Sequence, residues 1–189
     1  MQLFEQALKA KVRRIIVCGS CAEYGSSGFR YDYIPVDAPL EPTDAYAASK
    51  AAACIGITAL CKKEKFELIY FRLFSAFGEG QYENNLWTSL KKAAKENEDY
   101  AMTPGEQIRD FIPVNKVAEW FIKAVETKKI SSGNPVILNL ASGNSQTVRE
   151  FSEYWWKHWN AKGRLKIGSL SYRPHEVMRY VPLVSSNCL

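Results

Sequence analysis

Residues 45–74 have the sequence AYAASKAAACIGITALCKKEKFELIYFRLF, which predicts a long helix followed by a short strand. The first part, residues 45–63, is rich in alanine, the strongest helix former. Thr43 and Asp44 precede it, and either residue type can serve as a helix N-cap. The stretch therefore sets the start of the predicted helix at residue 45 and leaves open which side chain caps it.

The strand predicted at residues 68–74 is almost wholly apolar except for Arg72. A parallel strand that is covered on both faces has this composition. Residues 12–18 form a second candidate strand, which is rich in β-branched side chains and ends at Gly19. The order strand, helix, strand predicts an α/β fold with a parallel sheet and a crossover helix.

Further helices and strands alternate along the rest of the chain. We expect helices at residues 85–96, at residues 114–126 and from Thr147 onward, and a strand at residues 135–140. A short segment at residues 100–102 precedes a turn at Pro104-Gly105, and the tail is strand-like and then irregular from Lys162.

The bulk composition fits a globular domain with a substantial core. Of the 189 residues, 47% are hydrophobic and 24% are charged. No stretch approaches the roughly 18 consecutive apolar residues that a membrane span needs. The first residues lack the basic and apolar regions of a signal peptide. We therefore expect a cytoplasmic protein that has no membrane partner.

The net charge of +5 is scattered along the chain and does not form one basic stripe. Lys62, Lys63 and Lys65, for example, flank Glu64, which is typical of a solvated helix face. Nucleic-acid binding is therefore not expected. A few isolated arginines in loop-like segments are instead candidates for binding a small anionic ligand.

The cysteines offer two interpretations. Cys18-Gly-Ser-Cys21 has the CxxC spacing of redox motifs and of half a zinc site. The sequence has no second CxxC, and its two histidines, His158 and His175, are far apart. The loop-like residues after Cys21 favour the alternative, in which Cys18 is a small buried residue at a strand end. We therefore expect no metal site.

Tyr46 and Lys50 lie four residues apart, which places them on one face of the predicted helix. A free tyrosine, with a pKa of about 10, is a poor base at neutral pH. A neighbouring ammonium stabilises the phenolate, so that the phenol can exchange a proton with a substrate hydroxyl. The alternative is an ordinary solvated Tyr/Lys pair, although no other tyrosine of the ten has a lysine four places on.

Residues 15–25, IIVCGSCAEYG, resemble the strand and loop that carry the active-site serine in extended short-chain dehydrogenases/reductases, the NAD-dependent epimerase/dehydratase family. That family has an apolar strand, then Ser or Thr, three residues and Tyr-Gly; here Ser20 and Tyr24 take those places. Tyr46 and Lys50 match the family's Tyr-x-x-x-Lys. The resemblance implies that Ser20 positions the sugar oxygen, that Tyr46 is the acid/base, and that Lys50 stabilises the phenolate and holds the nicotinamide ribose. It also implies NAD or NADP as cofactor and a nucleotide-diphospho-sugar as substrate.

Later segments match the family in the same order. Residues 71–81, FRLFSAFGEGQ, resemble the Arg-x-Phe-Asn-x-x-Gly-Pro-Gly segment, which implies a cofactor contact for Phe74. Residues 103–112, TPGEQIRDFI, resemble the Gly…Arg-Asp-Phe/Tyr-Ile segment, whose arginine contacts the nucleotide diphosphate. The planar guanidinium of arginine can donate two parallel hydrogen bonds to the oxygens of a phosphate. The resemblance implies four substrate-binding residues: Ser75, Asn85, Arg109 and Arg173.

One element of the family is missing from the sequence. Members begin with a strand, a Gly-x-x-Gly-x-x-Gly turn and a helix that hold the cofactor pyrophosphate, and only nineteen residues precede Ser20. We therefore interpret the chain as an N-terminally truncated member that lacks roughly the first hundred residues. Residues 1–80 are then the later part of a Rossmann-type domain with the Ser/Tyr/Lys site. Residues 81–189 are a small, mainly nucleotide-sugar-binding α/β region, some of whose segments return to the sheet. Alone, such a chain should expose an apolar strand edge and bind dinucleotide weakly.

The residues after Ser20 narrow the expected reaction. Sugar 4,6-dehydratases have Thr-Asp-Glu where this chain has Ser20-Cys21-Ala22, and Glu23 is displaced by one position. We therefore expect an epimerase or a 4-ketoreductase, with a 4,6-dehydratase as the alternative. A non-catalytic remnant or interaction module is the alternative of another class. The resemblance also implies a possible homodimer.

Overall fold

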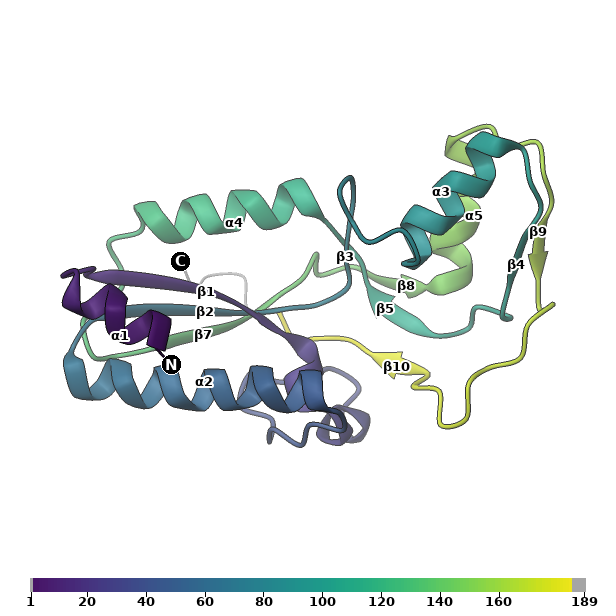
Figure 1. The fold of residues 1–189 in the computed structure, drawn as a ribbon. Helices are drawn as coiled ribbons and strands as arrows, with labels where there is room; N and C mark the ends of the chain where they lie inside the picture. Colours follow the sequence, from purple (N-terminus) through teal and green to yellow (C-terminus); the bar gives the residue numbers. More distant parts are fainter. Residues whose placement is uncertain (1, 185–189) are drawn as a thin grey trace.

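The computed structural model describes residues 2–184, which form an α/β fold. Three parallel strands lie between a layer formed by helices α1 and α2 and a layer formed by helix α4 (Figure 1). In chain order, the elements are α1 (Gln2–Lys9), β1 (Arg14–Ser20), η1 (Cys21–Tyr24), η2 (Ser26–Arg30), α2 (Ala45–Glu64), β2 (Glu67–Leu73), β3 (Ala76–Phe77), α3 (Leu86–Glu96), β4 (Tyr100–Met102), β5 (Ile108–Asp110), β6 (Ile112–Pro113), α4 (Val114–Glu126), β7 (Val136–Leu140), β8 (Ser145–Thr147), α5 (Val148–His158), β9 (Leu165–Ile167) and β10 (Arg179–Tyr180).

The order of the main sheet is β1-β2-β7, so β2 is its central strand. Because successive side chains of a strand point to opposite faces, β2 supplies both cores. Ile69 and Phe71 pack with α4 on one face, whereas Leu68 and Tyr70 pack with α2 on the other. All four side chains are fully buried, which explains the apolar run predicted for this strand.

Helix α2 begins where the sequence predicts, at Ala45, and extends one residue further than expected, to Glu64. The Asp44 carboxylate accepts the backbone N–H of Ala47 at 2.8 Å, so Asp44, and not Thr43, is the N-cap. Lys65 adopts the left-handed conformation at the other end, and its N–H bonds the Cys61 carbonyl.

Strand β1 lies at the edge of the described sheet, as expected from the sequence. Its apolar residues Ile15, Ile16 and Val17 are only half-buried, which is the liability predicted for this edge. One detail of the prediction is wrong: Cys18 is exposed and is not a buried strand-end residue. The reason is that β1 has a neighbouring strand on one side only.

The remaining elements form a second region beside the carboxyl ends of the main sheet (Figure 1). Helices α3 and α5 pack together through an aromatic cluster in which the rings of Trp87, Trp155 and Trp159 lie 5.2–5.7 Å apart. The predicted helices are confirmed to within one residue, but the two- and three-residue strands β3, β4, β5, β6 and β8 were not predicted, because such short segments carry no periodicity. The chain leaves this region after β6, contributes α4 and β7 to the layers of the main sheet, and returns to the region at β8. A domain boundary at residue 80 stays a prediction.

Within residues 2–184, no helix combines the length and the apolar character needed to cross a lipid bilayer.

Candidate active site

The main sheet places the predicted catalytic serine at its carboxyl edge. Ser20 is the last residue of β1 and lies in register with Leu73 of β2, which is in register with Leu140 of β7. Parallel sheets bind their ligands at this edge, outside the carboxyl ends of the strands.

Ser20 is also the N-cap of the short helix η1. Its Oγ accepts the N–H of Ala22 at 3.2 Å, and its own N–H donates to Glu23 Oε1 at 2.8 Å. These two bonds form a capping box. The hydroxyl proton bonds to none of the described residues, so it is available for a ligand.

Tyr46 and Lys50 occupy the first turns of α2, on the same face, as predicted. The Lys50 ammonium lies 5.8 Å from the centre of the Tyr46 ring and donates to the Cys18 carbonyl at 3.3 Å. Lys50 thus connects α2 to the end of β1, two residues before Ser20. The Tyr46 side chain is 58% exposed, and within residues 2–184 its hydroxyl makes no hydrogen bond. This face of the site is open to a ligand.

Arg109 lies on β5, near the short helix η1 that follows Ser20. Its Nη2 donates to the Val177 carbonyl at 2.6 Å and lies 3.5 Å from the Glu176 carboxylate. Burial lowers the pKa of Arg109, and the neighbouring charge of Glu176 opposes this effect. Arg109 is near enough to Cys21 for its charge to favour the thiolate, although burial dominates and raises the pKa of Cys21 to about 12. The region that carries Arg109 therefore meets the loop that carries Ser20.

A cavity of about 310 Å³ brings three of the four predicted substrate-binding residues together. Ser75, Asn85 and Arg109 line it, with the amide of Gln81. Aromatic rings supply much of the remaining wall, and two of them, Phe111 and Phe151, stack with centroids 3.9 Å apart. The other lining residues are Ala76, Phe77, Leu86, Trp87 and Val148. Polar groups and flat rings in one cavity fit a ligand that has both an anionic part and a planar part.

Two predicted residues lie apart from this group. Arg173 is exposed and does not line the cavity. Phe74 is only 3% exposed, and its ring packs against Tyr24 and Tyr180. Its side chain therefore belongs to the core, and the predicted roles of Phe74 and Arg173 stay predictions.

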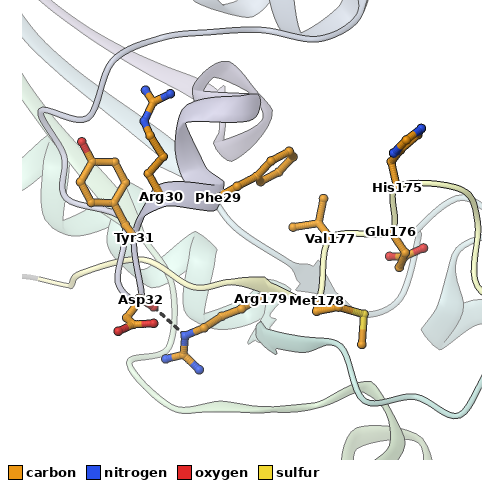
Figure 2. Close-up of a pocket in the computed structure, with 9 residues that line it drawn as sticks. All are labelled: Phe29, Arg30, Tyr31, Asp32, His175, Glu176, Val177, Met178 and Arg179. Carbon is orange, nitrogen blue, oxygen red and sulfur yellow. Dashed lines mark hydrogen bonds between the residues drawn. The ribbon is translucent and has the colours of Figure 1, made fainter.

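A second cavity, of about 570 Å³, lies between η2 and the segment before β10 (Figure 2). Glu176, the ion-pair partner of Arg109, lines it together with Arg30 and Arg179. The Arg179 Nε donates to the Asp32 carbonyl at 2.7 Å, the bond drawn in Figure 2. No role was predicted for Glu176, although a carboxylate three residues after the predicted phosphate-binding Arg173 was a signal for one.

The part of the chain that the structure describes has no group of three His, Cys, Asp or Glu side chains arranged to hold a metal ion.

The geometry at the carboxyl edge agrees with the comparison of this chain with known families. Residues 1–141 match the model of the NAD dependent epimerase/dehydratase family. The chain belongs to this family. The match covers the sheet, α2 and the segment around Arg109.

Among relatives, the chain is 25% identical over 159 residues to the UDP-glucose 4-epimerase of Corynebacterium glutamicum, an alignment that covers 75% of this chain and 46% of the relative. It is 25% identical over 186 residues to the dTDP-D-glucose 4,6-dehydratase of Mus musculus, covering 94% of this chain and 50% of the relative. The chain thus spans about half the length of these relatives.

Solved structures share the fold. A UDP-N-acetylglucosamine 4-epimerase from Methanobrevibacter ruminantium, in complex with UDP-N-acetylmuramic acid, superposes with a TM-score of 0.84 at 22% identity, covering 97% of this chain and 58% of that one. A dTDP-glucose 4,6-dehydratase from Bacillus anthracis, in complex with NAD, gives a TM-score of 0.79 at 22% identity, covering 96% and 56%. The fold is therefore Rossmann-like, and the chain covers part of it.

The thiols near the site should differ in reactivity. The thiolate is the nucleophile in alkylation, and a pKa of about 12 leaves about one Cys21 in ten thousand ionised at about pH 8. The pKa of Cys18 is also raised by desolvation, but the Lys50 ammonium opposes this effect. Cys18 is also exposed, whereas Cys21 is only partly exposed, so the Cys18 thiol is more accessible to a reagent in solution. We expect iodoacetamide to label Cys18 of the native protein well before Cys21, as measured by peptide mass spectrometry over time.

Labelling of the protein unfolded in urea is the control, since both thiols should then react at similar rates. In Cys18→Ser the fast label should be absent, and only the slow label on Cys21 should remain. Equal rates for Cys18 and Cys21 in the native protein would contradict the placement of this loop.

Proposed function

We propose that the protein carrying this chain is an NAD(P)-dependent nucleotide-sugar epimerase or 4-ketoreductase. The observation that carries the proposal is the arrangement of Tyr46 and Lys50. Their side chains share one face of α2, Tyr46 is open to solvent, and the Lys50 ammonium is tied to the end of the strand that carries Ser20.

Tyr46, Lys50 and Ser20 have different roles in the proposed proton transfer. The Tyr46 phenol exchanges a proton with the sugar hydroxyl that becomes a carbonyl, and the Lys50 ammonium stabilises the phenolate form. The Ser20 hydroxyl donates a hydrogen bond to the same sugar oxygen and so positions it. A bound nicotinamide would accept or donate the hydride, in both directions in an epimerase and once in a ketoreductase.

The described residues fit the reacting end of such a cofactor. The Lys50 ammonium and the exposed Tyr46 ring stand at the carboxyl edge of the parallel sheet, beside the free edge of β1. The sequence contains no Gly-x-x-Gly-x-x-Gly turn, and so offers none for the pyrophosphate. The complex of the Bacillus anthracis relative with NAD supports NAD as the cofactor.

The nucleotide diphosphate is proposed to occupy the cavity that Ser75, Asn85 and Arg109 line. The Arg109 guanidinium suits a phosphate, and the aromatic rings of the cavity offer a surface for a base. Arg173 is a second candidate for contact with the diphosphate. The solved relative in complex with UDP-N-acetylmuramic acid supports a nucleotide sugar as the substrate class.

Glu23 weighs against the 4,6-dehydratase alternative. Cys21 and Ala22 carry no carboxylate, and Glu23, the nearest candidate, is fully buried and ion-paired with Arg72. A carboxylate in that environment is not available to a sugar. Relatives of both kinds, epimerases and dehydratases, match this chain, so the argument rests on these side chains.

The alternative from another class is a non-catalytic remnant or interaction module. The chain spans about half the length of its relatives, which supports the proposal that it is a fragment of a longer enzyme. The DNA upstream of the Met1 codon distinguishes the two hypotheses. An in-frame strand with a Gly-x-x-Gly-x-x-Gly turn indicates a complete enzyme, and its absence favours the remnant. A cytoplasmic location stays a prediction.

We also propose that α2 forms a homodimer interface. Its outward face exposes apolar side chains at helical spacing, Ala48, Ala52, Ile55 and Ala59, and Ile55 is 62% exposed. A second copy of the same helix would bury this face.

Tyr46→Phe should lower kcat of the full-length enzyme by at least about a hundredfold while KM changes little, because the phenol acts in the transition state. The assay follows turnover of UDP-glucose and dTDP-glucose in the presence of NAD. Tyr154→Phe, at another exposed tyrosine, is the matched control and should retain wild-type turnover. Wild-type turnover in Tyr46→Phe would remove this residue from the mechanism.

Ile55→Arg should convert the protein from dimer to monomer in analytical ultracentrifugation, because it places a charge in the proposed apolar interface. Ile122→Arg is the control, since Ile122 is similarly exposed (56%) but lies on α4, on the other side of the sheet. A monomeric wild-type protein, or a dimer that persists in Ile55→Arg, would contradict the proposed interface.

A further inference from the structure

We propose that Glu23 is a positioning residue for the active site: its buried carboxylate, paired with Arg72, fixes the backbone of Ser20 and links it to the helix that carries Lys50. The catalytic part of this inference rests on the proposed function; the structural part does not.

The Glu23 carboxylate contacts the end of β1 and two side chains of β2. Its Oε1 accepts the N–H of Ser20 at 2.8 Å and the hydroxyl of Tyr70 at 2.7 Å. Its Oε2 accepts the Nε–H of Arg72 at 2.9 Å. The residue is fully buried, so water does not compete for these bonds. One carboxylate thus joins the end of β1 to two side chains of β2.

Arg72 is itself held from several directions, so it is a rigid partner for Glu23. Its Nη1 donates to the Tyr24 hydroxyl at 3.0 Å and to the Val36 carbonyl at 2.7 Å. Its Nη2 lies 3.4 Å from the Cys54 Sγ on α2. Burial acts to lower the pKa of Arg72, but the neighbouring groups, among them Tyr24 and Glu23, raise it overall, so the guanidinium stays charged.

The bonds of the loop determine what the Ser20 hydroxyl can do. Oγ accepts the N–H of Ala22, and its own proton bonds to none of the described residues, so this proton is free for another acceptor. Glu23 holds the Ser20 N–H at the same time, so that the residue cannot rotate out of the capping box. Ser20 is therefore oriented as a hydrogen-bond donor to a sugar oxygen, the role that the proposed mechanism requires.

Tyr70 extends the network to α2. Its hydroxyl lies 3.3 Å from the backbone carbonyl of Lys50 as well as 2.7 Å from Glu23. Gly19 leaves room for these groups, because a Cβ at this position would lie 2.6 Å from Glu23 Oε1 and would also collide with the Tyr70 ring. The absence of a side chain at residue 19 is thus part of the same arrangement.

The first test measures the Ser20 amide directly, in this chain, by NMR-detected hydrogen exchange. A charge-assisted bond to a buried carboxylate should protect this amide strongly. We expect exchange at Ser20 to be at least about tenfold faster in Glu23→Gln, because a neutral acceptor binds the N–H more weakly. Glu67→Gln is the matched control: Glu67 pairs with Arg14 across the same two strands, at their opposite end, and its loss should leave Ser20 unchanged.

If Glu23→Gln alone does not fold, because Arg72 is left without a counter-charge, the double variant Glu23→Gln/Arg72→Met replaces it. This variant contains no unpaired buried charge and should also show faster exchange at Ser20. Unchanged exchange at Ser20 in a folded variant that lacks the Glu23 charge would overturn the proposal.

The second test is kinetic and uses the full-length protein with UDP-glucose, dTDP-glucose and NAD. We expect the folded Glu23 variant to lose at least about tenfold in kcat while KM stays within about twofold, because positioning matters mainly in the transition state. Glu67→Gln should retain wild-type values. A Glu23 variant with wild-type kcat overturns the catalytic part. If the wild-type protein itself is inactive, the proposed function fails, and the exchange experiment still decides whether Glu23 holds Ser20.

Discussion

The buried ion pair between Glu23 and Arg72 connects the elements on which the candidate active site depends. Arg72 lies next to the carboxyl end of the central strand, in register with Gly19 of β1 and Asn139 of β7, so the three residues form a row across the sheet. Tyr24 joins this row, because its hydroxyl donates to the Asn139 side chain at 2.6 Å and accepts from Arg72. Removing one partner of such a pair costs about 3–5 kcal/mol, since the other charge is left buried without compensation.

The Glu23–Arg72 ion pair connects the architecture of the sheet with the proposed proton transfer. The sheet brings strand ends together, and the ion pair fixes the loop that leaves the first of them. Helix α2 supplies Tyr46 and Lys50 on an open face, and Lys50 is tied to the end of β1 through the Cys18 carbonyl. Glu23 and Arg72 are buried, whereas Tyr46 is exposed and Ser20 is partly exposed. The proposed catalytic groups would thus be held in place before substrate binds.

Local patterns in the sequence were sufficient to predict much of this structure. The alanine-rich helix, the apolar strand at residues 68–74 and the Tyr46/Lys50 spacing all depend on residues close together in the chain. The pairing of Glu23 with Arg72 depends on residues 49 positions apart, and local periodicity does not encode it. A signal was nevertheless present, because a charged residue within a buried strand requires a partner. The exposure of Cys18 could not be predicted locally, since it follows from the position of β1 at the sheet edge. The pairing of Arg109 with Glu176, 67 positions apart, likewise depends on the folding of the second region and is not encoded by local periodicity.

The central claim is that Ser20 and Tyr46 act together on one sugar oxygen. A crystal structure of the full-length protein with NAD and a bound UDP-sugar tests this claim most directly. The account predicts that the Tyr46 hydroxyl and Ser20 Oγ both lie within about 3 Å of the same sugar oxygen, with the diphosphate beside Arg109. A sugar bound away from Ser20 and Tyr46, or a diphosphate that does not contact Arg109, would contradict it.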